Sequence, residues 1–318
     1  MTVLGHCLVF SGFVESRAFA VIYAFHMPYF FFLSGYLYKK KVSCEYISSK
    51  VKTLLVPVII YQSIKLVFYG ILFSLRLQDK YYYISFDGYW FLTTLLYITI
   101  MYYAVDLIAE RGEDERIKHL IRVSSVIILL VLGLIYPASI SDQPNQTIAT
   151  AFVGYFFYVF GFYIRKYEYH RKRIEQRLCT GFVGLFLLAI LIVTVRANTR
   201  TIDMYTSRYS ITWIFLAHAL LGTVGMYYVT VMINTNRLLE FFGKNSITVL
   251  LMHTPIVKAI PPALRISGAS NWMILAITTF LSIFISCTAI AIFNRYMPFM
   301  AGRLCWEDLY GSRKTMKT

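Results

Sequence analysis

Long apolar runs separated by short charged connections dominate this sequence and constrain what it can fold into. Ten runs can be placed along the chain: 1–13, 19–38, 51–75, 88–108, 120–140, 146–164, 178–195, 210–233, 238–260 and 272–293. The hydrocarbon core of a bilayer takes about 20 helical residues, so nine runs are candidate spans and the first is too short. Because a bilayer leaves an unpaired backbone no hydrogen-bond partner, we predict an all-α, polytopic integral membrane helical bundle of about ten transmembrane helices, the first of them truncated.

Composition excludes the classes of protein that compete with this interpretation. Only 15% of the residues are charged, 58% are hydrophobic and the mean hydropathy is +0.60, whereas a soluble domain carries about a quarter of charged residues. The net charge is +15, but the basic residues form no domain-sized stretch outside the apolar runs, so no nucleic-acid partner is expected. The expected environment is the lipid bilayer. The five cysteines show no C-x-x-C spacing, which indicates neither a zinc site nor a disulfide framework, and we expect no metal.

The basic residues alternate from one connection to the next. If the chain crosses the membrane at each run, 22 of the 31 Lys and Arg residues fall on the side that also holds both termini, and eight fall on the other side. The positive-inside rule then makes the 22-residue side cytoplasmic and predicts a multi-pass protein of the inner (plasma) membrane. No internal repeat or linker interrupts the runs, so we predict one transmembrane domain over residues 1–295 and a basic cytoplasmic tail over 296–318.

Histidine is the main titratable residue at membrane depth, because every Asp and Glu falls in a connection or near the end of a run. His6, His26, His218 and His253 lie inside runs, together with Lys65. Ionisable groups in a bilayer are costly and therefore point to function, and imidazole can take up and return a proton near neutral pH. For His218 the interpretation as an interhelical hydrogen-bond partner is favoured over a role in catalysis.

The first two runs place their histidines at matching depth. His6 lies seven residues before the outer end of its run and His26 seven residues after the start of the next, about 10 Å below the outer boundary in each case. The two side chains are thus predicted to meet across an antiparallel helix pair. Pro28 lacks an N–H, which leaves the Ala24 carbonyl without its helical partner and predicts a broken helix that opens on a polar pocket. The alternative is a span kinked at proline with a structural histidine.

Several motifs resemble one family of membrane enzymes. The segment 25–37, Phe-His-Met-Pro-Tyr-Phe-Phe-Phe-Leu-Ser-Gly-Tyr-Leu, resembles the hallmark of acyltransferase family 3, in the branch of fucose 4-O-acetylase and related polysaccharide O-acetyltransferases. The segments 3–6 (Val-Leu-Gly-His), 88–92 (Gly-Tyr-Trp-Phe-Leu) and 242–246 (Phe-Gly-Lys-Asn-Ser, followed by His253) resemble further family motifs. Members normally carry a dozen or so residues before the Gly-His pair, so we expect the natural start to lie upstream.

The resemblance implies a membrane O-acetyltransferase. It would move an acetyl group from acetyl-CoA, as co-substrate, to a hydroxyl of a cell-surface polysaccharide or its sugar precursor, such as capsule, O-antigen or exopolysaccharide. His6 would be the catalytic base, with His26 orienting it or contacting the thioester carbonyl. The expected CoA-binding residues are Lys39, Lys40, Lys41, Lys50 and Lys52, near the place where many relatives carry Arg-x-x-Arg, and the expected substrate-binding residues are Lys65, Trp90, Asp203, Arg208 and His253.

Two other classes of function fit the same composition. A lipid-linked glycan flippase or other polytopic transporter has similar spans, and so does a non-enzymatic membrane scaffold. A proton-coupled transporter usually needs a buried carboxylate relay, so buried histidines without buried carboxylates favour the enzyme. The positive-inside rule accounts for the lysine cluster equally well, and the sequence leaves homo-oligomerisation and the identity of the sugar open.

Overall fold

The computed structural model describes residues 1–38, 44–74, 89–135, 145–168, 177–197, 202–207, 209, 211–233 and 236–302. Its α-helices are α1 (Thr2–Phe10), α2 (Arg17–Tyr36), α3 (Cys44–Ser74), α4 (Trp90–Ala109), α5 (Glu115–Ile135), α6 (Asn145–Glu168), α7 (Arg177–Thr194), α8 (Thr212–Ile233), α9 (Arg237–Lys244), α10 (Ser246–Ile266) and α11 (Asn271–Tyr296). Within these ranges, eight helices are long and apolar enough to cross a membrane: α2, α4, α5, α6, α7, α8, α10 and α11. The predicted polytopic helical bundle is confirmed.

The predicted ninth run differs from the structure. A single helix over 238–260 is wrong, because the chain forms α9, leaves helical geometry at Asn245 and starts α10 at Ser246. The side chain of Asn245 donates to the Phe241 carbonyl at 2.7 Å and accepts from Asn294 on α11 at 3.0 Å. These two bonds fix the turn between the helices. The residues at this turn, 243–246, are Gly-Lys-Asn-Ser and interrupt the apolar run, as Gly and Asn commonly do at a helix end.

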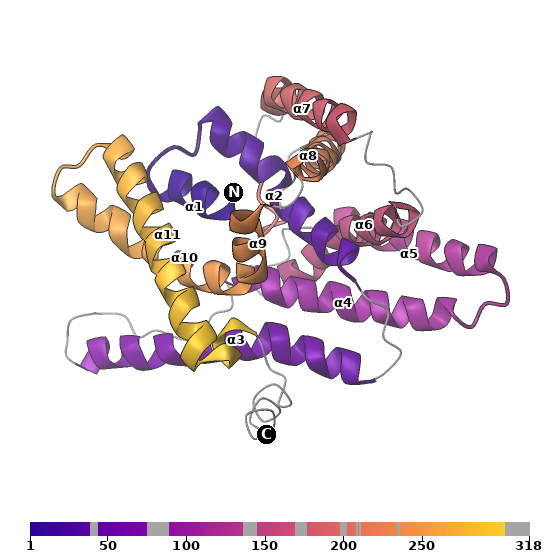
Figure 1. The fold of residues 1–318 in the computed structure, drawn as a ribbon, viewed down its shortest axis with the longest axis horizontal. Coiled ribbons are helices and arrows are strands. Elements are labelled where there is room, and N and C mark those ends of the chain that lie inside the picture. The colour runs from indigo at the N-terminus through magenta and orange to yellow at the C-terminus, as the bar shows by residue number, and fades with distance from the viewer. Residues whose placement is uncertain are drawn as a thin grey trace, which may run out of the picture.

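Two groups of helices make up the molecule (Figure 1). In the larger group α2 packs against α6 and α8, α6 packs against α4 and α5, and α7 packs against α8. In the smaller group, at the left of Figure 1, α1 packs against α10 and α11. The short α1 is held there by Arg265, whose Nη2 donates to the Phe10 carbonyl at 2.7 Å. The seam between the two groups is where a polar site can form.

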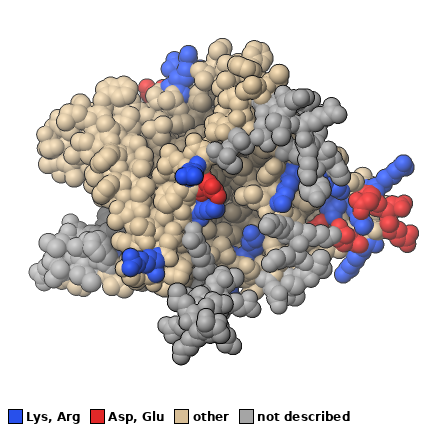
Figure 2. All heavy atoms as spheres, viewed as in Figure 1, with Lys and Arg blue, Asp and Glu red and all other residues tan. Residues whose placement is uncertain are grey.

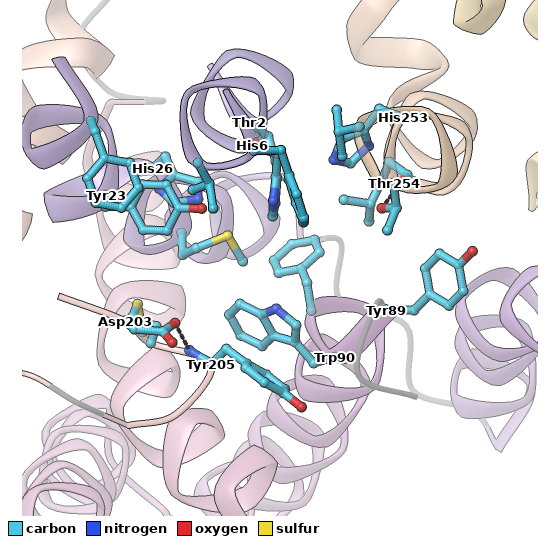
Figure 3. A pocket seen from close by; sticks show the side chains of 18 of the residues that line it. Thr2, His6, Tyr23, His26, Tyr89, Trp90, Asp203, Tyr205, His253 and Thr254 are labelled. Carbon is cyan, nitrogen blue, oxygen red and sulfur yellow. Dashed lines mark hydrogen bonds between the residues drawn. The ribbon is translucent and has the colours of Figure 1, made fainter. Parts of the chain in front are cut away.

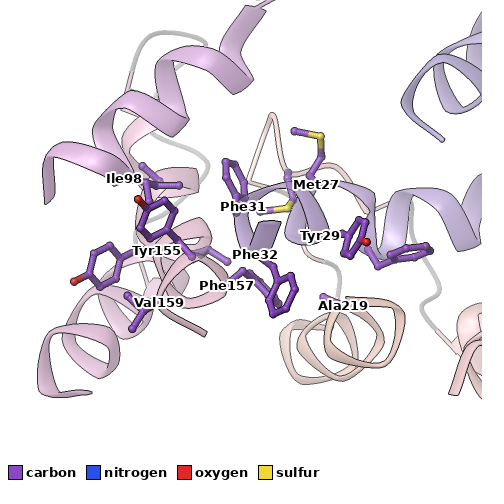
Figure 4. Close-up of a cluster of buried hydrophobic side chains, with 14 of the residues drawn as sticks. Met27, Tyr29, Phe31, Phe32, Ile98, Tyr155, Phe157, Val159 and Ala219 are labelled. Carbon is purple, nitrogen blue, oxygen red and sulfur yellow. The ribbon is translucent and has the colours of Figure 1, made fainter. Parts of the chain in front are cut away.

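Aromatic residues of α2 and α6 form the centre of the larger group (Figure 4). Phe31, Phe32, Tyr155 and Phe157 are at most 1% exposed. The predicted break at Pro28 is wrong, because α2 runs without interruption from Arg17 to Tyr36. Packing on α6 and α8 holds the helical geometry on both sides of the proline, so the missing N–H removes one bond without ending the helix.

Glycines allow α2 and α6 to approach closely. A Cβ at Gly35 would overlap the carbonyl group of Tyr158, and a Cβ at Gly161 would overlap the carbonyl oxygen of Phe32. The two helices therefore touch through their backbones, as small residues permit in membrane bundles. This contact sets the position of α2, which carries His26.

A buried ion pair joins α4 to α5. Arg122, 4% exposed, donates to Asp106 Oδ1 from Nε at 3.0 Å and from Nη2 at 2.6 Å, and Nη2 also reaches Glu110 at 2.7 Å. Further charges of both signs lie where α4 connects to α5, at the right-hand edge of Figure 2, whereas most of that face is uncharged. The sequence placed Asp106 near the end of a run but did not reveal its partner.

The glycine contact predicts a test of the fold. Gly161→Ala or Gly35→Ala should destabilise the folded protein by about 1–3 kcal/mol, because the added methyl forces the two backbones apart. The measurement is the thermal unfolding midpoint of the purified protein in detergent. Gly243→Ala is the matched control, since a Cβ there would meet no heavy atom within 4 Å apart from its chain neighbours and the backbone of its own helix. Equal midpoints for all three variants would contradict the close approach.

Candidate functional site

A cavity of about 420 Å³ lies in the seam between the two groups of helices. Its walls come from α1, α2, the start of α4, the segment 202–205 and one face of α10. The polar and aromatic lining residues are Thr2, His6, Tyr23, His26, Tyr89, Trp90, Asp203, Tyr205, His253, Thr254 and Lys258. This volume falls in the range of about 300–1,000 Å³ typical of small-molecule sites.

Three histidines meet at this cavity, one from each of α1, α2 and α10 (Figure 3). The ring centroids of His6 and His253 are 5.2 Å apart, with the rings tilted by 52°. On the other side of His6 lies Tyr23, whose ring centroid is 6.5 Å from that of His6 and 4.9 Å from that of His26. The sequence predicted that the side chains of His6 and His26 meet; in the structure both line the cavity, Tyr23 contacts each of their rings, and the ring beside His6 is that of His253 on α10.

Hydrogen bonds to backbone carbonyls set the tautomers of two of these rings. His26 donates from Nδ1 to the Ile22 carbonyl at 2.8 Å, and His253 donates from Nδ1 to the Val249 carbonyl at 2.8 Å. A carbonyl oxygen can only accept, so in each neutral ring Nδ1 carries the proton and Nε2 carries the lone pair. The arrangement can therefore accept hydrogen bonds or protons at Nε2.

The segment 202–205 supplies an aromatic and acidic wall. The Tyr205 ring lies 5.8 Å from the Trp90 ring at the start of α4. Asp203 accepts from the Tyr205 backbone N–H and from the Thr206 hydroxyl, each at 3.0 Å. Thr150 on α6 donates to the Met204 carbonyl at 2.6 Å and so anchors the segment. A tilted aromatic pair beside a carboxylate offers a stacking surface and a hydrogen-bond acceptor to a polar ligand.

Other residues predicted from the sequence lie elsewhere. Lys65 on α3 sits over the ring of Tyr89, with Nζ 4.5 Å from the ring centroid, and does not line the cavity. Lys50 stacks on Tyr46 at 5.5 Å, and neither it nor Lys52 is part of the lining. Four further residues predicted from the sequence, Lys39, Lys40, Lys41 and Arg208, lie outside the described residues.

Some residues that line the cavity were not predicted from the sequence, whereas the interhelical role considered for His218 agrees with the structure. Thr254 and Lys258 belong with His253 to a stripe on α10 at positions 250, 253, 254, 257 and 258, the spacing of one helix face, and this stripe could have flagged them. Tyr23 gave no signal, because tyrosine is common in the apolar runs. His218 lies away from the cavity lining and its Nε2 is 3.1 Å from the hydroxyl of Thr194 on α7, an interhelical hydrogen bond.

Comparison with known proteins adds one match. The family model of acyltransferase family 3, described as an acyltransferase domain, matches residues 1–292. Neither the curated proteins nor the solved structures contain a match to this chain. The matched region holds every wall of the cavity.

The anchoring of the segment 202–205 can be tested on stability. Thr150→Val keeps the side-chain shape and removes the donor to the Met204 carbonyl, so we expect a loss of about 1–3 kcal/mol, measured as a lower unfolding midpoint. Thr288→Val is the matched control, because that exposed hydroxyl bonds only to its own helix. A midpoint for Thr150→Val equal to that of Thr288→Val would argue against the anchor.

Proposed function

Because the chain belongs to acyltransferase family 3 and is a multi-pass membrane acyltransferase, we propose that it acetylates a cell-surface glycan. The donor in this proposal is acetyl-CoA and the acceptor is a hydroxyl of a polysaccharide or of its sugar precursor. The cavity in the seam is the proposed active site. The observation that carries the proposal is the convergence of His6, His26 and His253 on one cavity that also has an aromatic wall.

The proposed reaction begins at His6. As the acceptor oxygen attacks the thioester carbonyl, the hydroxyl proton moves to a ring nitrogen of His6, which acts as general base. The tetrahedral intermediate then collapses, the C–S bond breaks, and the proton passes from His6 to the CoA thiolate. The products are the acetyl ester and CoA thiol, so protons balance over the cycle.

The tautomer of His26 narrows its proposed role. With Nδ1 donating to the Ile22 carbonyl, neutral His26 presents only a lone pair at Nε2 and cannot donate to a thioester oxygen. It is suited to accepting a hydrogen bond from a second hydroxyl of the acceptor sugar and so to orienting that sugar. The oxyanion needs donors instead, and the Tyr23 hydroxyl and the Lys258 ammonium are the lining groups that we propose for this.

The aromatic wall is the proposed acceptor subsite. Apolar faces of sugar rings pack on aromatic side chains, and Trp90 and Tyr205 provide two such surfaces. Asp203 lies beside them and retains acceptor capacity, since each of its carboxylate oxygens carries more than one lone pair. Arg208 and Lys65 stay as proposed contributors, the latter through Tyr89, whose ring it covers.

The acyl donor is proposed to enter from the cytoplasmic side of the plasma membrane. The polyanionic CoA nucleotide needs cations, and Lys39, Lys40, Lys41, Lys50 and Lys52 form the nearest basic cluster in sequence after α2. The same cluster follows from the positive-inside orientation, with both termini in the cytoplasm. Charge reversal of the pair Lys50 and Lys52 would separate a CoA role from a purely topological one.

One assay tests the proposed function. We expect purified wild type to transfer label from acetyl-CoA to surface-glycan acceptors, and His6→Ala to lower kcat by about 10²- to 10⁴-fold because the general base is lost. His26→Ala should also lower transfer. His218→Ala is the matched control, since this histidine bonds to Thr194 away from the cavity.

The outcomes separate the alternatives. Equal transfer by wild type, His6→Ala and His26→Ala would remove both histidines from catalysis. No transfer by any preparation, with a competent acceptor present, would instead favour transport of a lipid-linked glycan.

A further inference from the structure

His253 places an unused ring nitrogen inside the protein. The side chain is 1% exposed, its Nδ1 is committed to the Val249 carbonyl, and its Nε2 is buried with no hydrogen-bond partner among the described residues. A buried acceptor without a partner costs free energy, so natural proteins seldom retain one without a use for it. The cavity at which it lies shows where that use would be.

His6 is the one histidine of the three whose tautomer the fold does not set. His26 and His253 each donate to the carbonyl four residues earlier, whereas within the described part of the chain no hydrogen bond holds the ring of His6. A general base needs its lone pair on the nitrogen that faces the substrate, so something must hold the proton on the other nitrogen. Only a hydrogen-bond acceptor next to His6 can do this.

Geometry favours His253 over His26 as that acceptor. The His6 and His253 ring centroids are 5.2 Å apart and the rings are tilted by 52°, a separation that a water-bridged hydrogen bond between ring nitrogens can span, or a direct one after rotation of the His6 ring. The His26 ring packs edge-on against Tyr23, and its contact with His6 runs through that ring (Figure 3).

We propose that His253 is the positioning residue for His6. Its Nε2 accepts a hydrogen bond from one ring nitrogen of His6, so that the opposite nitrogen of His6 presents its lone pair to the acceptor hydroxyl. The inference rests on the proposed function and changes the role that the sequence suggested for His253, which was contact with the substrate.

The role fits each step of the proposed transfer. When His6 takes the hydroxyl proton, it becomes an imidazolium with two N–H groups, and His253 Nε2 accepts from the one that faces away from the substrate. The positive charge is thereby stabilised while the O–C bond forms. When the C–S bond breaks, His6 returns the proton to the thiolate, and His253 has exchanged no proton.

Kinetics of substituted full-length protein, assayed with labelled acetyl-CoA and a surface-glycan acceptor, test the proposal. His253→Phe keeps the ring and removes the acceptor, so we expect kcat to fall by about 100-fold with KM nearly unchanged. His253→Gln offers an amide oxygen in place of Nε2 and should restore kcat to within about tenfold of wild type. His218→Phe is the control for placing phenylalanine at a buried histidine, and its kcat should match wild type.

A double-mutant comparison gives a readout that a merely structural role would not move. In the His6→Ala background, His253→Phe should cause no further loss of kcat, because His253 acts only through His6. A further loss, equal kcat for the Gln and Phe variants, or a raised KM with unchanged kcat would each overturn the proposal. If His253→Phe fails to fold, as judged by its unfolding midpoint, His253→Gln is combined with His6→Ala instead. A kcat of this double variant equal to that of His6→Ala alone supports the proposal, and a lower kcat overturns it.

Failure of the proposed function would look different. Wild type that transfers no acetyl to any acceptor overturns both the function and the inference. Wild type that is active and sensitive to His6→Ala, with His253→Phe as active as wild type, overturns the inference alone.

Discussion

A bilayer supplies no hydrogen-bond partners, so a titratable side chain that the protein buries is costly unless it is paired within the chain or placed at a cavity. Arg122 is paired with Asp106 and Glu110, and His218 bonds to Thr194 through Nε2. Three histidines, from α1, α2 and α10, are treated differently, because their rings converge on a shared cavity. The lack of hydrogen-bond partners in the bilayer, which makes the fold helical, therefore also identifies the candidate site: it is the place where several titratable side chains converge on one cavity.

The site depends on how two groups of helices are held. Within the larger group, Gly35 and Gly161 let the backbones of α2 and α6 touch, and this contact fixes the helix that presents Tyr23 and His26. Within the smaller group, Arg265 ties α10 to the end of α1, so that His6 and His253 stay together. The cavity is the seam between these two units, and neither unit contains the whole site.

The character of the cavity suits acyl transfer from a thioester. Backbone carbonyls hold two of its histidines as acceptors, and the third lies between them, where its proton can be directed. The carboxylate of Asp203 accepts hydrogen bonds from two donors of its own segment. We therefore regard it as part of the polar wall of the cavity and not as a second base beside the histidines.

The sequence alone determined that this is a helical membrane protein of acyltransferase family 3, and it predicts that His6 and His26 lie at one depth. Run length, charge alternation and the motif around His26 are local properties, and a bilayer of set thickness converts residue counts into depth. The sequence did not determine that α9 and α10 are separate helices, that Asp106 pairs with Arg122, or that His253 and not only His26 stands beside His6. Those facts depend on which helices are neighbours and how each is rotated about its axis, and side-chain contacts between distant segments set both.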